Sequence, residues 1–323
     1  MSLTTEQTEW FSQTFARLVG NVEQAIVGKT EVVQLAFIAL IAEGHLLLED
    51  FPGTGKTSLA RAMAQTIQGN HHRIQFTPDL LPSDVTGVTV YDQRSQEFEF
   101  HRGPIFANVV LADEINRASP KTQSALLEVM EESQVTVDGV THPVDQPFVV
   151  IATQNPIEQA GTYRLPEAQL DRFLIKTSLG YPEHDDAVRI LANAPKGKAA
   201  AVVRPIIGGG SILQLIEMAQ QVHVDPALYA YVSRLTEETR DAPEVVLGTS
   251  IRAGLALVRA ARARAAAFGR GYVLPDDVKS LAIPVLAHRI VLDPEEDFRG
   301  TTSEDVIRRV LERVHVPQES AAR

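Results

Sequence analysis

The segment Gly53-Thr54-Gly55-Lys56-Thr57 has the residue types and spacing of a loop that binds phosphate. It lies between an apolar run and a segment with helical spacing, so consecutive backbone N–H groups and a helix N-terminus would face the same anion. Lys56 is expected to reach the β- and γ-phosphates of a nucleotide, and the Thr57 hydroxyl to ligate Mg²⁺. The predicted nucleotide-binding residues of this loop are Pro52, Gly53, Thr54, Gly55, Lys56, Thr57 and Ser58.

Asp50 departs from the strict form of this motif, which has glycine at its first position. The string from Gly53 to Thr57 is intact, and it contains the residues that would contact the phosphates and the metal. We therefore expect the departure to matter little. The alternative, a glycine-rich turn that only begins a helix, would give Lys56 no role.

Two acidic residues, Asp113 and Glu114, end the apolar run VVLADE. Beside a phosphate-binding loop, Asp113 is expected to hold Mg²⁺, mostly through water, and Glu114 to polarise the water that attacks the γ-phosphate. An apolar strand that ends in two acids is common, so this interpretation depends on the loop. Taken alone, the pair would be an exposed strand end.

Asn155 ends another apolar run, FVVIATQNP. From a neighbouring strand its side chain would hold the attacking water or the γ-phosphate. The alternative is a polar residue that merely ends a strand before Pro156. The sequence has no NKxD string to specify guanine, so the expected cofactors are ATP and Mg²⁺ rather than GTP.

Five short apolar runs would position these residues. They are rich in β-branched and aromatic residues and alternate with helical or loop segments, which is typical of the buried strands of a parallel sheet. In such an α/β fold, ligands bind at the carboxyl ends of the strands. The predicted strands are 45–49, 73–76, 109–112, 148–153 and 173–178, preceded by predicted helices over 4–25 and 31–42.

Two segments with apolar–polar alternation interrupt this order and predict β-hairpins. The first covers 84–103, and the second covers 134–148 around an Asp138-Gly139 turn. Both lie where a minimal nucleotide-binding core would have only short connections.

After residue 181 the spacing becomes helical, without strands. The stretch 193–210, with its prolines and glycines, predicts a loop. We therefore expect an α/β nucleotide-binding domain over 1–181 and an all-helical domain over 182–323. The helices of the second part are predicted near 183–193, 211–221, 225–240, 249–268, 275–287 and 302–314.

Composition excludes several classes of protein. The net charge of −11 argues against a non-specific grip on nucleic acid, which needs an excess of Lys and Arg. The absence of cysteine excludes disulfides and thiolate metal sites. No apolar run approaches the roughly 20 residues of a membrane span, and the N-terminal residues are polar, so a cytoplasmic location is expected. Neither zinc spacing among the histidines nor a G-x-S-x-G elbow is present.

Several longer sequence segments, spread over nearly all of the chain, are similar to those of a known protein family. With the motifs above, the sequence resembles the MoxR family of AAA+ ATPases. The clade of this family has a helix-2 insert and a further hairpin before sensor 1, and the two predicted hairpins match these two features. The resemblance implies a P-loop AAA+ core with a five-stranded parallel sheet, followed by an all-helical lid. The strings are DEINRASPKTQSALLEVMEE (113–132), ATQNPIEQAGTYRLPEAQLDRF (152–173), LGTSIRA (247–253), GYVLPDDVKSLA (271–282) and VLAHRI (285–290).

The resemblance also implies roles for single residues. Asn155 matches sensor 1, and Arg252 matches sensor 2, which reaches the γ-phosphate from the lid. The alternative for Arg252 is a solvated arginine on a helix with several others. The IVGK string resembles the segment that packs on adenine, and it supplies the expected nucleotide-binding residues Ile26, Val27 and Gly28.

Arg172 matches the position of an arginine finger, which acts on the ATP of a neighbouring subunit. A positive charge supplied there would offset the charge that develops on the γ-phosphate. Arg164 and Arg117 are rival candidates. The alternative for Arg172 is a surface ion pair with Glu167 or Asp171.

The implied function is Mg²⁺-dependent ATP hydrolysis by a homo-oligomeric ring, expected to be a hexamer. Such a ring would remodel proteins or assist assembly and metal-cofactor insertion, commonly with a von Willebrand factor A protein. The DxSxS string of that domain is absent, so this partner would be a separate chain.

Two other functions are open. A DNA-acting motor or chelatase-type subunit would have basic hairpin tips. Here the first hairpin has only Arg94 and Arg102 among several acids, and the second has no Lys or Arg. A sigma-54-type activator would need a GAFTGA-like loop, which the sequence lacks.

Overall fold

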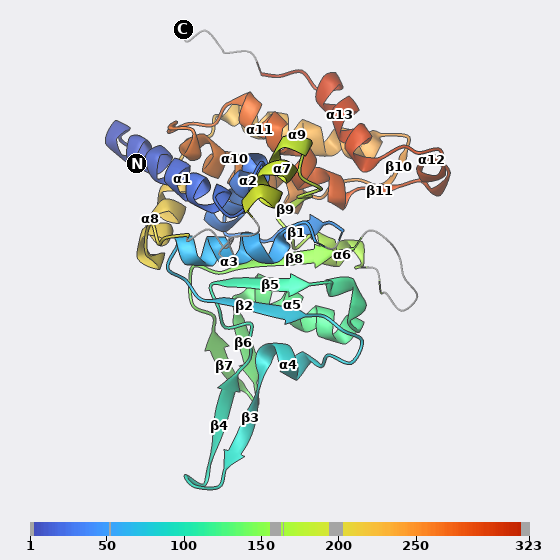
Figure 1. Ribbon diagram of the computed structural model, residues 1–323. Coiled ribbons are helices and arrows are strands. Elements are labelled where there is room, and N and C mark those ends of the chain that lie inside the picture. Colours follow the sequence, from blue (N-terminus) through green and yellow to red (C-terminus); the bar gives the residue numbers. More distant parts are fainter. Residues whose placement is uncertain (1–2, 52, 156–162, 164, 194–202, 318–323) are drawn as a thin grey trace. The chain divides into compact units, whose positions relative to one another are not determined.

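The computed structural model describes residues 3–51, 53–155, 163, 165–193 and 203–317 (Figure 1). These residues form two compact units. The first, the sheet unit, lies within Ala16–Leu165 and Thr177–Gln214. The second, the helical unit, lies within Met1–Phe15, Pro166–Lys176 and Leu215–Arg323. The division into domains at residue 181 stays a prediction.

A five-stranded parallel sheet confirms the predicted α/β core, with strand order β2-β5-β8-β1-β9. Strand β5 lies between β2 and β8, is fully buried and pairs in register with both neighbours. Strand ends differ from the prediction by one or two residues, because apolar patterning does not mark where backbone pairing stops. The strands are β1 (Leu46–Glu49), β2 (His71–Gln75), β5 (Val109–Asp113), β8 (Val149–Gln154) and β9 (Ile175–Thr177).

Helices surround the strands along the chain, and the long predicted ones are all present. Helix α3 begins at Lys56 and packs against β5 and β2, and α5 begins after Ser119, whose side chain accepts from the Thr122 N–H. The helices up to residue 220 are α1 (Thr5–Glu23), α2 (Thr30–Ile41), α3 (Lys56–Thr66), α4 (Pro82–Thr86), α5 (Pro120–Glu132), α6 (Glu167–Leu170), α7 (His184–Asn193) and α8 (Gly209–Gln220).

Both predicted hairpins form, and they lie side by side in the sheet unit (Figure 1). The rings of Phe100 and His142, one from each hairpin, stack with their centroids 4.0 Å apart. The first hairpin is shorter than predicted, because residues 84–86 belong to helix α4. The strands are β3 (Gly87–Asp92) and β4 (Glu97–Arg102), then β6 (Gln134–Val137) and β7 (Val140–Pro143).

The prediction for the helical unit needs two corrections. A two-stranded antiparallel pair, β10 (Val245–Leu247) with β11 (Val291–Leu292), lies among the helices where none was predicted. Runs of two or three residues are too short for a period of two to be read from the sequence. The short helix α12 (Pro294–Phe298) was also missed. The predicted helices here are α9 (Pro226–Asp241), α10 (Ile251–Ala267), α11 (Pro275–Leu286) and α13 (Ser303–Arg313).

Asp277, in the first turn of α11, is a buried charge that the helical unit satisfies completely. Its carboxylate accepts from the Leu274 N–H at 2.9 Å and from both Nη atoms of Arg270 at 2.6 and 2.7 Å. Arg264 of α10 approaches it at 3.5 Å. Hydrogen bonding to Asp277 raises the pKa of Arg270 above its ordinary value. Within the described residues, no helix combines the length and apolarity needed to cross a membrane.

We expect Asp277→Ala to lower the free energy of unfolding by about 2–4 kcal/mol, because Arg270 and the Leu274 N–H would lose a buried acceptor. Chemical denaturation measures this change. Asp276→Ala is the matched control, since Asp276 is exposed, and it should stay within about 0.5 kcal/mol of the parent. Equal effects of the two substitutions would contradict the role of the buried pair.

Candidate functional site

A pocket of about 360 Å³ lies in the sheet unit at the carboxyl ends of β2 and β5. It brings together most of the phosphate-binding loop and both acids of the VVLADE run, as the sequence predicted. It also contains two residues that the sequence analysis missed, Arg73 and Gln75. The lining residues are Gly53, Gly55, Lys56, Thr57, Ser58, Arg73, Gln75, Asp113 and Glu114.

The loop has the backbone that its glycines allow. Gly53 has φ +87° and Gly55 has φ +101°, in the left-handed region that side chains disfavour. Lys56 then begins α3, so the helix N-terminus opens into the pocket. The Lys56 ammonium donates to the Asp50 carbonyl oxygen at 3.3 Å. Thr54 lies in the same turn, whereas Pro52 lies outside the described residues.

Asp50, the departure from the motif, has a structural role that the sequence did not reveal. It is 2% exposed, and its carboxylate accepts from the N–H groups of Leu179 and Gly180 at 2.7 and 2.8 Å. The Ser178 hydroxyl donates to it at 3.2 Å. The side chain thus ties the start of the loop to the segment after β9.

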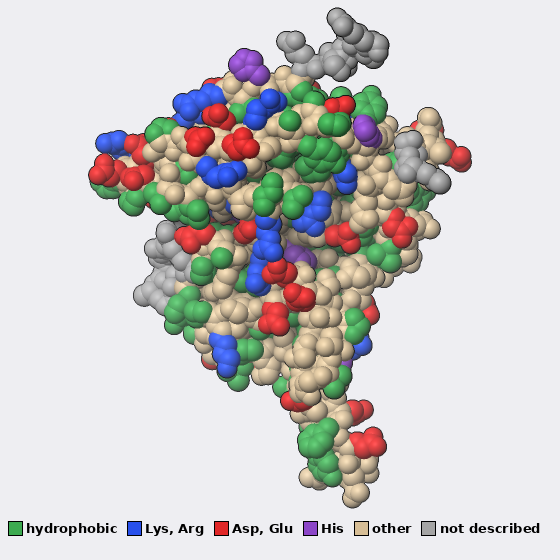
Figure 2. Space-filling model, turned by 180° about the vertical axis from the view of Figure 1, so that it is seen from behind, with side chains coloured by type: hydrophobic (Ala, Val, Ile, Leu, Met, Phe, Trp, Pro, Cys, Tyr) green, Lys and Arg blue, Asp and Glu red, His purple; other side chains and the backbone are tan. Residues whose placement is uncertain are grey.

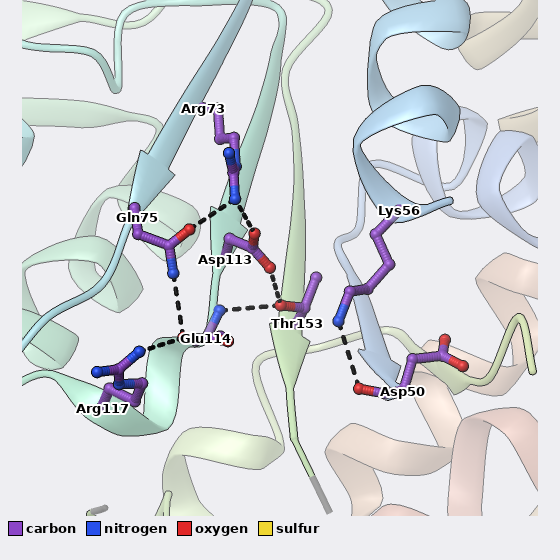
Figure 3. A network of polar contacts seen from close by, with 8 residues as sticks. All are labelled: Asp50, Lys56, Arg73, Gln75, Asp113, Glu114, Arg117 and Thr153. Atoms are coloured by element: carbon purple, nitrogen blue, oxygen red, sulfur yellow. Dashed lines mark hydrogen bonds and ion pairs between the residues drawn. The ribbon is translucent and has the colours of Figure 1, made fainter. Parts of the chain in front are cut away.

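Asp113 and Glu114 sit in a continuous polar network (Figure 3). One oxygen of Asp113 accepts from the Thr153 hydroxyl at 2.6 Å, and the other from Arg73 at 2.6 Å. Glu114 accepts from Gln75 at 3.1 Å and from Arg117 at 2.7 Å. Three adjacent strands, β2, β5 and β8, therefore contribute to one cluster.

Glu114 has an unusual backbone, with φ 58° and ψ 50°. This left-handed conformation is disfavoured for a residue with a side chain. The Glu114 N–H donates to the Thr153 hydroxyl at 2.9 Å, which holds the turn in place. The chain thereby leaves β5 with the Glu114 carboxylate lining the pocket.

The donor set fits Mg²⁺ bound together with a nucleotide. Thr57 and Asp113 present a hydroxyl and a carboxylate in one pocket with Lys56. Mg²⁺ prefers oxygen ligands and is commonly held by one or two protein groups plus phosphates and water. Within the described residues, no cluster of three or more His, Cys, Asp or Glu side chains is arranged to hold a metal by itself.

The IVGK segment lies beside the loop. A Cβ atom at Gly55 would be 3.6 Å from Cδ1 of the buried Ile26, so Ile26 packs close to the loop, and Val27 is half-buried. At Gly28, φ is +75° and a Cβ atom would lie 1.8 Å from Oδ2 of Asp186. The positive φ favours glycine at position 28, and a side chain there would also have to displace the Asp186 carboxylate of α7.

Asn155 follows β8 and is half-buried. The preceding residue, Gln154, accepts at its carbonyl from the Asp50 N–H at 3.1 Å, so the chain leaves β8 beside the start of the loop. Asn155 is not among the residues that line the pocket. The role of Asn155 as sensor 1 stays a prediction.

Arg172 and Arg252 belong to the helical unit. Arg252, at the start of α10, approaches Asp171 at 3.9 Å and has a side chain that is 55% exposed. Asp171 is held more tightly by the buried Arg289, at 2.8 Å. Arg164 lies outside the described residues.

Arg289 anchors the segment that carries Arg172. Besides the Asp171 carboxylate, it donates to the carbonyl oxygens of Phe173 at 2.8 Å and Val285 at 3.0 Å. Burial lowers the pKa of Arg289 to about 10, which leaves it charged at neutral pH. The VLAHRI string therefore has a structural explanation: His288 also donates to the Phe173 carbonyl oxygen, at 3.0 Å.

We expect Asp50→Ala to lower the unfolding temperature by several degrees, because two buried N–H groups would lose their acceptor, at about 1–3 kcal/mol each. Thermal unfolding followed by circular dichroism measures the shift. Asp79→Ala, at an exposed site in the connection between β2 and α4, is the control. An unchanged unfolding temperature for Asp50→Ala would contradict the anchoring role.

Comparison with known proteins places the chain in a family. Residues 45–175 match the ATPase family associated with various cellular activities (AAA), and residues 237–310 match the AAA lid domain. A crystal structure of a candidate ATPase from Cytophaga hutchinsonii ATCC 33406 superposes with a TM-score of 0.91 at 37% identity, covering 97% of this chain and 98% of that one.

Two curated relatives match along most of their length. The chain is 48% identical over 308 residues to the uncharacterized protein YeaC of Bacillus subtilis, covering 95% of this chain and 96% of the relative. It is 42% identical over 317 residues to the chaperone MoxR1 of Mycobacterium tuberculosis, covering 95% and 84%. On this similarity, and with a nucleotide-type pocket in a matching fold, the chain belongs to the MoxR family of AAA+ ATPases.

Proposed function

We propose that this chain binds ATP with Mg²⁺ in the pocket of the sheet unit and hydrolyses it. The observation that carries the proposal is the convergence of Lys56, Thr57, Asp113 and Glu114 on one pocket. The loop N–H groups and Lys56 would bind the phosphates, and Thr57 and Asp113 would ligate Mg²⁺. Bound Mg²⁺ would supply charge neutralisation at the phosphates. Glu114 would polarise the attacking water.

Residues from elsewhere would complete the site. Asn155 is proposed as sensor 1, and Arg252, whose side chain is 55% exposed, is proposed as sensor 2. Ile26, Val27 and Gly28 would border the adenine. Arg172 is proposed as the arginine finger. Arg117 is less suited to act on a neighbour, because it pairs with Glu114 of its own chain.

The chain is further proposed to work as a homo-oligomeric ring, with a hexamer expected, that remodels proteins or assists assembly and metal-cofactor insertion. One relative is named as a chaperone. A von Willebrand factor A protein, on a separate chain, is the proposed partner.

The first hairpin suits a protein client better than DNA. Its exposed side chains are mostly apolar or acidic, with Arg94 and Arg102 as its two arginines, and Figure 2 shows hydrophobic and acidic groups together at its end. Phosphates would instead require basic groups at this tip. The exposed apolar residues of β3 and β4 are Val88, Val90, Tyr91 and Phe98, and the acids are Asp92, Glu97 and Glu99.

Glu114→Gln should keep ATP binding and lower the turnover rate by about 10²–10⁴-fold, because the amide cannot accept a proton from the attacking water. Calorimetry measures ATP binding, and phosphate release measures turnover. Lys56→Ala is the companion variant and should lose ATP binding itself. Normal ATP hydrolysis by Glu114→Gln would contradict the role of Glu114 in polarising water. Unchanged ATP affinity of Lys56→Ala would contradict the assignment of residues 53–57 as the phosphate-binding loop.

Arg172→Ala should lower turnover by about 10³-fold or more if Arg172 acts on a neighbour's ATP. Mixing Arg172→Ala subunits with Lys56→Ala subunits should then restore part of the activity, because an intact Arg172 would face an intact loop at some interfaces. Phosphate release from mixtures of varied ratio measures this rescue. If no ratio gives rescue, Arg172 is not a trans-acting finger.

A further inference from the structure

We propose that Arg73 competes with the divalent cation for the carboxylate of Asp113 and so sets the Mg²⁺ concentration at which nucleotide binds. This inference rests on the proposed function, since it takes Asp113 as part of the metal site. Arg73 would be a positioning residue that acts through Asp113 and Gln75, without touching the reacting atoms.

Both oxygens of Asp113 have partners. Oδ1 accepts from the Thr153 hydroxyl at 2.6 Å, and Oδ2 accepts from Nη2 of Arg73 at 2.6 Å. Thr153 is fully buried on β8, so that hydrogen bond is fixed by the sheet. A cation that reached this carboxylate would therefore meet the Arg73 guanidinium on the accessible oxygen.

Arg73 is better able to leave the ion pair than Asp113, because its side chain is more exposed. Its side chain is 47% exposed, whereas that of Asp113 is 10% exposed at the end of the buried strand β5. Two positive groups at one carboxylate oxygen repel each other, and the exposed one can be hydrated instead. Arg73 also lines the pocket that the cation would enter.

The Arg73–Asp113 ion pair is connected to Glu114 through Gln75, because one nitrogen of Arg73 contacts both Asp113 and Gln75. Nη2 of Arg73 also donates to Oε1 of Gln75 at 2.6 Å, and Nε2 of Gln75 donates to Glu114 at 3.1 Å. The amide of Gln75 is thus oriented by Arg73 on one side and donates to Glu114 on the other (Figure 3). When Arg73 releases Asp113, it also loosens the contact that aims Gln75 at Glu114.

The test is the Mg²⁺ dependence of nucleotide binding by Arg73→Met. A fluorescent ATP analogue is titrated over a series of Mg²⁺ concentrations and in EDTA. Loss of the competing charge should lower the Mg²⁺ concentration for half-saturation by about three- to tenfold, a range discounted for the exposure of Arg73. Affinity in EDTA should not increase. Mn²⁺ without nucleotide, followed by electron paramagnetic resonance, should bind more tightly to the variant.

Two further variants sharpen the result. Arg94→Met removes one arginine at the turn of the first hairpin and should leave the Mg²⁺ dependence unchanged. Arg73→Gln has the same expected effect as Arg73→Met and replaces it if the methionine variant does not fold. Arg73→Lys keeps the charge and should lie closer to the parent protein than either.

A half-saturating Mg²⁺ concentration that is unchanged or higher in Arg73→Met and Arg73→Gln overturns the proposal, as does a matching change in Arg94→Met. If the parent protein shows no Mg²⁺-dependent nucleotide binding, the proposed function fails. If the parent shows that dependence and the Arg73 variants do not shift it, the competition alone fails.

Discussion

The carboxylate of Asp113 is buried at the end of β5, and a buried charge must find partners. Thr153 and Arg73, from the strands on either side of β5, provide them at 2.6 Å each. The parallel register makes these strands end at the same edge, so a hydroxyl, an acid and a guanidinium meet there. The left-handed turn at Glu114 follows, because its N–H is held by the same Thr153 hydroxyl. The contacts that satisfy this one charge therefore also place Arg73, Asp113 and Glu114 in the lining of the pocket.

The same requirement organises other parts of the chain. Asp50 is buried at the start of the phosphate-binding loop and is satisfied by N–H groups after β9, which links two segments far apart in sequence. In the helical unit, Asp171 and the buried Arg289 pair at 2.8 Å and hold the segment that contains Arg172. Removing one partner of such a pair is expected to destabilise the fold by more than their Coulomb attraction suggests, because the other charge would stay buried without a partner.

Much of the fold followed from local patterns. The five strands, both hairpins and the long helices were predicted within a few residues, because each is marked by a period of two or about 3.6 over several residues. The pair β10–β11 was missed, since its strands have only three and two residues. Residues 84–86 were assigned to the first hairpin, yet they form the end of α4, where Pro82 begins a helical turn.

The sequence by itself determined the chemistry of the pocket, because Lys56, Thr57, Asp113 and Glu114 belong to contiguous motifs whose spacing is local. Only the tertiary structure decided what surrounds them. Arg73 and Gln75 lie on β2 without a motif, and they reach the acids only because β2 pairs with β5. Asp50 looked like a defect until the fold placed the N–H groups of Leu179 and Gly180 against it. Contacts between residues distant in sequence depend on strand order and register, and a single sequence does not encode these as a readable pattern.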